Sequence, residues 1–195
     1  MTRKLFNLEN NPDLVNFLQD IEIVDNIEDA DIVLFAGTSD VSPVLYGCKK
    51  ERGTISNYRK DLEEKKVYLK KMRPNQLALG IGRGAQLLAV LNGAKLIQDA
   101  GGHLRNDTHT ILSADRLFYY EITSLHHQLI DSESLTRIDG CRLLYYASMY
   151  GYDPEIITFT CKDRPKCLCI QGHPELMADQ PIAEVINKII HELCK

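Results

Sequence analysis

Short apolar runs alternate with helical stripes along the first half of the chain. The apolar runs predict strands at Lys4–Leu8, Ile21–Val24, Ile32–Ala36 and Gln76–Ile81. Apolar residues at helical spacing predict helices between them, at Pro12–Asp20, Tyr58–Met72 and Gly82–Asn92. Alternation of this kind is typical of a mainly parallel sheet with helices on its faces.

The pattern changes after Asp107, where strands follow one another. They are predicted at Leu117–Ile122, Arg142–Ala147, Ile156–Cys161 and Lys166–Ile170. The last two flank turn residues that predict a hairpin, and Pro181–Lys195 predicts an amphipathic helix that closes the domain. We therefore expect an α/β fold in a single domain over residues 1–195. Its central, mostly parallel sheet is flanked by helices, with a small antiparallel hairpin near the C-terminus.

Length, charge and cysteine content narrow the class of protein. The 195 residues fit one domain. The net charge of −4 does not indicate the basic surface that nucleic-acid binding requires. No run approaches the roughly 18 apolar residues of a membrane span, and the N-terminus lacks the apolar segment of a secretory signal. Six cysteines in such a chain predict free thiols in a reduced, cytoplasmic compartment. We expect neither nucleic acid nor a membrane as a partner.

The most informative segment joins an apolar run directly to a helix through glycines. In GIGRGAQ (residues 80–86), small residues at Gly80 and Gly84 allow strand and helix to approach, and the central residue takes a strained backbone. This is the pattern of a nucleophile elbow, except that Gly82 stands where Ser or Cys belongs. The N–H of Arg83 would face a developing oxyanion. A dinucleotide-binding loop is the alternative, but its third glycine is missing.

Two further segments follow predicted strands. His173 and Glu175 are separated by Pro174, and a histidine held by a carboxylate can move protons for a nucleophile. Gly37 follows the run Ile32–Ala36, where open α/β sheets place their ligands, and offers a second oxyanion N–H. A helix-entry turn and an ordinary loop are the structural alternatives for the two segments.

Taken in order, AGTSDVSPVLYG, GIGRGAQ and QGHPE resemble the class I glutamine amidotransferase superfamily. The stand-alone gamma-glutamyl-gamma-aminobutyrate hydrolase type is the most similar branch, with its G-G-x-D-V-x-P-x-x-Y-G, G-I-C-R-G-x-Q and Q-x-H-P-E patterns. NGAKLIQD and TSLHHQ also resemble segments of that branch, so the likeness runs from about residue 32 to 176. Small phage-borne members are similar in size, and a viral origin would place the chain in a host cytoplasm.

The resemblance implies a flavodoxin-like fold and a thiol mechanism. A cysteine at the position of Gly82 would attack the gamma-carbonyl of glutamine or a gamma-glutamyl amide, with His173 oriented by Glu175. The N–H groups of Arg83 and of Gly37 or Thr38 would hold the oxyanion. Residues implied for the substrate pocket are Asp40, Gln86, Ser124, His126, His127 and Gln128. No cofactor or metal is implied. The partner is the small-molecule substrate, or alternatively also a separate synthetase chain that receives ammonia.

Gly82 departs from this pattern, because a residue without a side chain cannot form an acyl-enzyme. Losing the nucleophile costs about 10⁴–10⁶ in rate, so we expect a nearly inactive chain that still binds substrate. Either Gly82 was introduced into an active parent, which the intact neighbouring motifs favour, or the chain is a natural pseudoenzyme with a ligand-binding or regulatory role. Cys167 and Cys169 are predicted to pack in a sheet, and His103 and His109 are candidates for the pocket rim.

Overall fold

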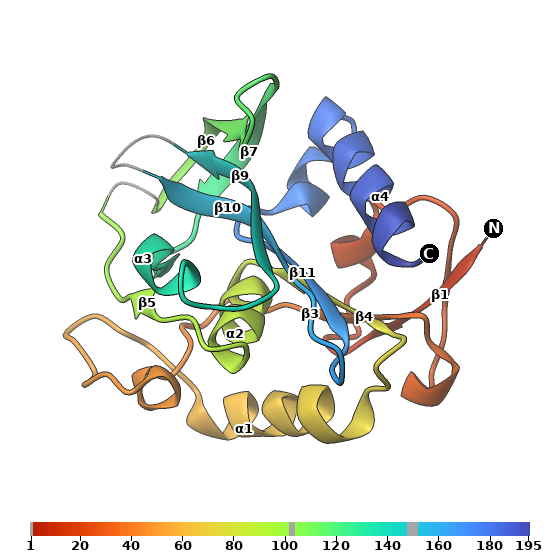
Figure 1. The fold of residues 1–195 in the computed structure, drawn as a ribbon, viewed down its shortest axis with the longest axis horizontal. Helices are drawn as coiled ribbons and strands as arrows, with labels where there is room; N and C mark the ends of the chain where they lie inside the picture. The colour runs from red at the N-terminus through yellow and green to blue at the C-terminus, as the bar shows by residue number, and fades with distance from the viewer. Residues whose placement is uncertain (1, 102–103, 148–151) are drawn as a thin grey trace.

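A mixed sheet runs through the computed structural model, which describes residues 2–101, 104–147 and 152–195. Within these residues nine strands are ordered β2-β1-β3-β4-β11-β10-β9-β6-β7 (Figure 1). The first five are mutually parallel: β1 (Arg3–Asn7), β2 (Ile21–Ile23), β3 (Ile32–Phe35), β4 (Leu77–Ile81) and β11 (Lys166–Ile170). The others pair antiparallel: β6 (Leu104–Ser113), β7 (Tyr119–Leu125), β9 (Cys141–Ala147) and β10 (Asp153–Phe159).

Four α-helices and several shorter helical turns accompany the sheet in the described residues. The α-helices are α1 (Tyr58–Lys66), α2 (Arg83–Leu91), α3 (Ser132–Leu135) and α4 (Pro181–Leu193). The shorter turns are η1 (Pro12–Val15), η2 (Ile27–Asp29), η3 (Pro43–Tyr46), η4 (Val67–Lys71) and η5 (Pro174–Met177). A small separate ladder joins β5 (Leu96–Ile97) to β8 (Leu129–Ile130). None of the helices in the described part is long and apolar enough to cross a membrane.

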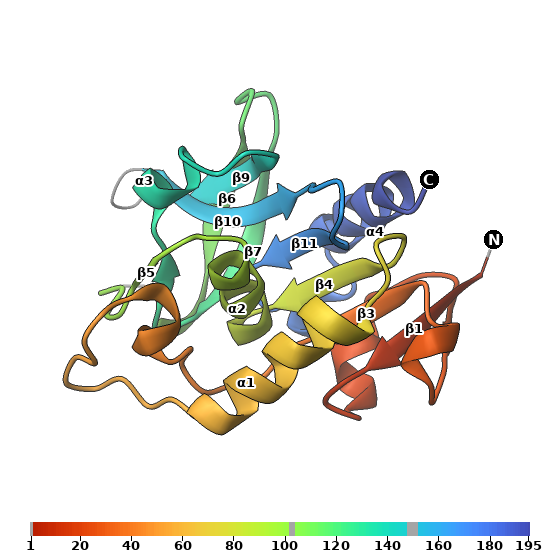
Figure 2. The same ribbon diagram turned by 60° about the horizontal axis from the view of Figure 1, so that its bottom comes forward.

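Helices cover both faces of the sheet (Figures 1 and 2). Alternate residues of the central strands point to opposite faces, as the pleat requires. On β3, Val33 and Phe35 pack in the apolar cluster that includes α2, whereas Ile32 and Leu34 pack in the cluster that includes α4. The buried central strands therefore divide the core into two layers, one on each side of the sheet.

The predicted α/β fold and its C-terminal hairpin are confirmed. The sheet is mixed and not mostly parallel, because β9, β6 and β7 extend the hairpin into an antiparallel half. Two local differences accompany this one. The helix expected over Pro12–Asp20 is only the turn η1, because Asp20 takes a positive φ of 53° and Asn187 of α4 accepts the N–H of Gln19. Strand β6 has no counterpart in the expectation, since its largely polar sequence lacks an apolar alternation. Pairing with β7 and β9 places it in the sheet.

The order of the strands brings the three motif segments together. Strands β3, β4 and β11 are parallel neighbours, with Gly80 opposite both Phe35 and Cys169. Their carboxyl ends therefore lie side by side at one edge of the sheet (Figure 2). The segments beginning at Gly37, Gly82 and Gln171 leave the sheet at that edge, which is where open α/β sheets bind ligands.

Candidate active site

Gly82 holds the backbone of a nucleophile elbow although it has no side chain. It lies between β4 and α2 with φ 54° and ψ −118°, a conformation that strains any residue with a Cβ. Its N–H donates to the carbonyl of Ile170 at 2.9 Å, and its carbonyl accepts the N–H of Gln86 at 3.2 Å. The N–H of Arg83 lies in the first turn of α2, where N–H groups have no partner within the helix. This N–H group therefore follows Gly82 directly and is not used inside the helix.

The close approach predicted for the glycines on either side is present. A Cβ on Gly84 would lie 2.0 Å from the carbonyl oxygen of Phe35, which no rearrangement of a side chain could relieve. A Cβ on Gly80 would lie 2.7 Å from the backbone of Ala85. The sharp turn from strand to helix therefore depends on these two glycines.

His173 and Glu175 form a hydrogen-bonded pair over the elbow. Nδ1 of His173 lies 2.7 Å from Oε1 of Glu175, so a neutral ring carries its proton on Nδ1 and leaves Nε2 as an acceptor. The N–H of His173 also donates to Oγ1 of Thr123 at 2.6 Å. A Cβ built on Gly82 would lie 3.0 Å from Nε2 and 2.9 Å from Cε1 of His173. The acceptor nitrogen therefore faces the position of the missing side chain.

The side chain of Arg83 connects the elbow to α1 and to the Gly37 segment. Its guanidinium is buried and forms ion pairs with Asp61 and Glu64. Asp61 also accepts the N–H of Ser42 at 2.9 Å. Burial raises the pKa of Glu64, and the charge of Arg83 opposes that effect. The guanidinium of Arg83 is thus engaged in structural ion pairs.

A cavity of about 640 Å³ opens beside Gly82, and most of the expected site residues line it. Its lining includes Gly37, Thr38, Asp40, Gly82, Arg83, Gln86, His126, His127 and His173. Glu175 lies behind His173. Two expected pocket residues do not line it. Ser124 is buried in β7, and Gln128 is fully buried, accepting the N–H of Val41 at 2.8 Å through Oε1.

Asp40 and His127 meet on the wall of this cavity. Nδ1 of His127 lies 3.1 Å from Oδ1 of Asp40. Oδ2 of Asp40 accepts the N–H of Ile55 at 2.7 Å, and the N–H of Asp40 donates to the carbonyl of Ile55 at 2.8 Å. Asp40 therefore fixes both the imidazole and the segment that precedes α1.

A buried charged cluster beneath His126 was not expected from the sequence. The fully buried carboxylate of Glu155 lies 3.0 Å from Nε2 of His109 and 3.3 Å from Nε2 of His126. Nδ1 of His126 faces the carbonyl of Gln128 at 2.9 Å. Burial disfavours the charged forms of Glu155 and His126, but the opposite charge of each favours the charged form of the other. The pKa of Glu155 therefore falls to about 2, and the pKa of His126 rises.

A signal that could have indicated this cluster is an acidic residue inside a buried strand. Glu155 interrupts the apolar sequence of β10, whose seven residues are all buried. His109, expected at the pocket rim, lies in this cluster, and His103 falls outside the described residues.

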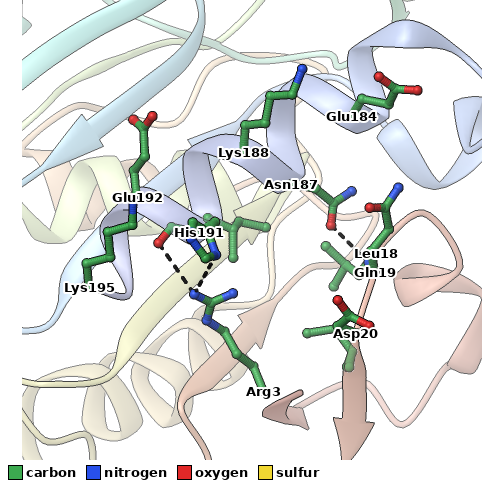
Figure 3. A pocket seen from close by; sticks show the side chains of 12 residues that line it. Arg3, Leu18, Gln19, Asp20, Glu184, Asn187, Lys188, His191, Glu192 and Lys195 are labelled. Atoms are coloured by element: carbon green, nitrogen blue, oxygen red, sulfur yellow. Dashed lines mark hydrogen bonds between the residues drawn. The ribbon is translucent and has the colours of Figure 1, made fainter. Parts of the chain in front are cut away.

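A second cavity, of about 490 Å³, lies at the opposite end of the parallel strands (Figure 3). Arg3 and Ile21, which begin β1 and β2, line it together with the C-terminal part of α4. Arg3 contacts Nδ1 of His191 at 3.2 Å (Figure 3). Its lining mixes both signs of charge and contains none of the motif residues, so we place the candidate active site at the first cavity.

No cysteine belongs to the described lining of the cavity beside Gly82. Cys167 and Cys169 are buried in the core, as predicted, and burial raises the pKa of the Cys167 thiol to about 12. All six cysteines are free.

Among the described residues, no group of three or more His, Cys, Asp or Glu side chains is arranged to hold a metal ion.

Comparisons with known proteins agree with this geometry. The Peptidase C26 family matches residues 10–175. A glutamine amidotransferase-like protein of Lactococcus lactis subsp. lactis, YvdE, is 28% identical over 167 residues, which are 74% of this chain and 66% of that protein. The chain thus spans slightly less than two thirds of this relative.

Solved structures share the fold at low sequence identity. A protein assigned as a GMP synthase subunit from Thermoplasma acidophilum has a TM-score of 0.63 and 16% identity, covering 100% of this chain and 94% of its own. A glutamine amidotransferase from Thermotoga maritima has a TM-score of 0.55 and 13% identity, and the match covers 98% of this chain and 94% of that protein. The resemblance drawn from the motifs is therefore confirmed: the chain belongs to the Peptidase C26 family and has the fold of the class I glutamine amidotransferases.

Proposed function

We propose that this chain binds glutamine or a gamma-glutamyl amide in the cavity beside Gly82, on a gamma-glutamyl hydrolase or glutaminase scaffold that lacks its nucleophile. The observation that carries the proposal is the pairing of the elbow with His173. The elbow backbone is retained at Gly82, and Nε2 of His173 faces the missing side chain while Nδ1 is held by Glu175. This is a proton-transfer pair without a group to deprotonate.

The complete reaction needs a thiol at position 82. With one present, His173 takes its proton, and the thiolate attacks the gamma-carbonyl carbon. The oxyanion then accepts hydrogen bonds from the N–H of Arg83 and of Gly37 or Thr38. His173 passes the proton to the departing amine, leaving a thioester. Water, deprotonated by His173, then releases glutamate and restores the thiol.

Without the thiol, the same residues serve for binding. Asp40, Gln86 and His127 offer polar groups to the glutamyl part, and the two oxyanion donors hold the carbonyl. The proposal is the same whether Gly82 is natural or was introduced. A natural origin makes the chain a pseudoenzyme with a ligand-binding role. The delivery of ammonia to a separate synthetase and the cytoplasmic location remain predictions.

Titration of the intact chain with L-glutamine, followed by NMR of the histidine side chains, tests the binding. We expect the signals of His127 and His173 to shift as the cavity fills. His191 provides an internal control, because it lines the cavity at the opposite end of the sheet. Unchanged signals of His127 and His173 at several millimolar glutamine and at several millimolar gamma-glutamyl methylamide would contradict the proposal.

A further inference from the structure

The cavity beside Gly82 has an apolar rim. Leu176 and Ile55 line it, although they are 64% and 76% exposed to solvent. Leu176 belongs to η5, and Ile55 belongs to the segment before α1. Large apolar side chains exposed at the mouth of a cavity gain from contact with an apolar part of a ligand, because their surface then leaves water.

Both rim residues are held by backbone hydrogen bonds. The N–H of Leu176 donates to the carbonyl of His173 at 3.1 Å. Ile55 exchanges two hydrogen bonds with Asp40, through its N–H to the carboxylate and through its carbonyl. The apolar surface is thus fixed by the same residues that form the cavity, so a ligand that contacts it does not have to order a loop.

The charges in the lining do not favour an acidic group at this rim. Each arginine or histidine side chain of the lining is paired with a carboxylate, as Arg83–Asp61, His126–Glu155, His127–Asp40 and His173–Glu175. Arg83 is the only Lys or Arg in the described lining. An additional carboxylate on the amine side of the substrate would therefore lose hydration without meeting an uncommitted cation.

The position of Leu176 indicates which part of the ligand it contacts. In the proposed reaction His173 gives a proton to the departing amine, so the amine lies on the His173 side of the carbonyl. Leu176 follows His173 by three residues in the same turn. We propose, on the basis of the proposed function, that the amine part of the gamma-glutamyl amide is neutral and apolar, and that Leu176 is its main specificity-determining contact, with Ile55 as the second.

Calorimetric binding to the intact chain tests this, since the absence of a nucleophile leaves the amides uncleaved. The probes are gamma-glutamyl methylamide, gamma-glutamyl n-butylamide and the gamma-glutamyl amide of 4-aminobutanoate, which ends in a carboxylate. We expect the n-butylamide to bind about tenfold more tightly than the methylamide, and the carboxylate compound more weakly than the n-butylamide.

Variants assign the preference to the rim. Leu176→Ser should reduce the tenfold preference of the n-butylamide over the methylamide to about twofold, and Leu176→Met should preserve the tenfold preference. Leu117→Ser is the matched control, because Leu117 is 73% exposed in the β6–β7 turn and does not line the cavity. An unchanged preference in Leu176→Ser, or equal affinity of the parent for both alkyl amides, would overturn the inference and leave the proposed function standing. Failure of all three amides to bind would overturn the inference, and failure of glutamine to bind as well would also overturn the proposed function.

Discussion

The imidazole of His173 lies directly against Gly82, so that a Cβ added to the glycine would stand 2.9 Å from Cε1 of the ring. That distance is shorter than real Cβ contacts, and Glu175 holds the ring through a 2.7 Å hydrogen bond. Any side chain at position 82 must therefore move the ring by a few tenths of an ångström. The site combines the backbone of a nucleophile elbow with a histidine ring that partly occupies the position of the missing side chain.

This contact predicts that Gly82→Ala destabilises the fold. The variant introduces a Cβ at φ 54° and against His173, and we expect it to lower the free energy of unfolding by about 1–3 kcal/mol. Urea denaturation of the two proteins measures the difference. Gly101→Ala is a control for the added methyl group, because nothing lies within 4 Å of its Cβ position. Equal stability of Gly82→Ala and the parent would show that the elbow is not strained.

The ion pairs of Arg83 predict a large effect of its removal. Arg83→Met leaves the buried carboxylates of Asp61 and Glu64 without this partner, and we expect a loss of about 3–5 kcal/mol in the free energy of unfolding. Arg59→Met is the matched control, since Arg59 forms an exposed pair with Glu63. Denaturant unfolding should place the control within about 1 kcal/mol of the parent. Similar losses in both variants would contradict this account of Arg83.

The buried cluster of Glu155 predicts a specific dependence of stability on pH. The pKa of Glu155 is about 2 in the folded chain, below about 4.3 in an unfolded one, so its contribution is present above pH 4.3 and is lost as the pH falls toward 2. The pKa of His126 is raised, so its contribution is complete below about pH 6.5 and is lost as the pH rises through the folded value.

Glu155→Gln tests the acidic part of that prediction. Removal of the charge should lower the stability at pH 6 by about 3 kcal/mol and flatten the decline between pH 4.3 and 2. Thermal unfolding across pH measures this, and Glu22→Gln, at an exposed position of β2, provides the control. If Glu155→Gln unfolds with the pH profile of the parent, the cluster does not hold a charged carboxylate.

The core thiols should resist alkylation. Burial raises the pKa of Cys167 to about 12 and that of Cys169 well above its ordinary value, whereas Cys161 is exposed. With iodoacetamide at pH 8 we expect mass spectrometry to find Cys161 modified first, and Cys167 and Cys169 only after unfolding. Rapid modification of Cys167 in the folded chain would be inconsistent with its place in the sheet.

The sequence predicted those parts of the molecule that depend on local patterns. The apolar run of β4, the glycines around Gly82 and the His173–Glu175 spacing are local, and each lies where it was expected. Strand β6 was missed because its polar residues are placed by pairing with β7 and β9. Likewise, Glu155 meets His109 and His126 only after distant strands join the sheet, so its partners could not be identified from spacing.

The pocket residues were also predicted correctly only where a local pattern places them. Asp40, Gln86 and His127 line the cavity, as their motifs suggested. Gln128, from the same motif as His127, points instead into the protein and binds the backbone of Val41. Which member of a motif reaches the cavity depends on how the segment turns between β7 and β8, and residue types alone do not determine this.

Glutamate release by Gly82→Cys tests the central claim most directly. The substrates are glutamine and the two gamma-glutamyl alkylamides, with the parent chain and Gly82→Ala as controls. We predict that the parent and Gly82→Ala stay near the uncatalysed rate, whereas Gly82→Cys releases glutamate at least about 10⁴-fold faster than the parent. A folded Gly82→Cys protein that binds glutamine but releases no more glutamate than the parent would contradict the claim that the missing thiol is what separates this chain from an active hydrolase.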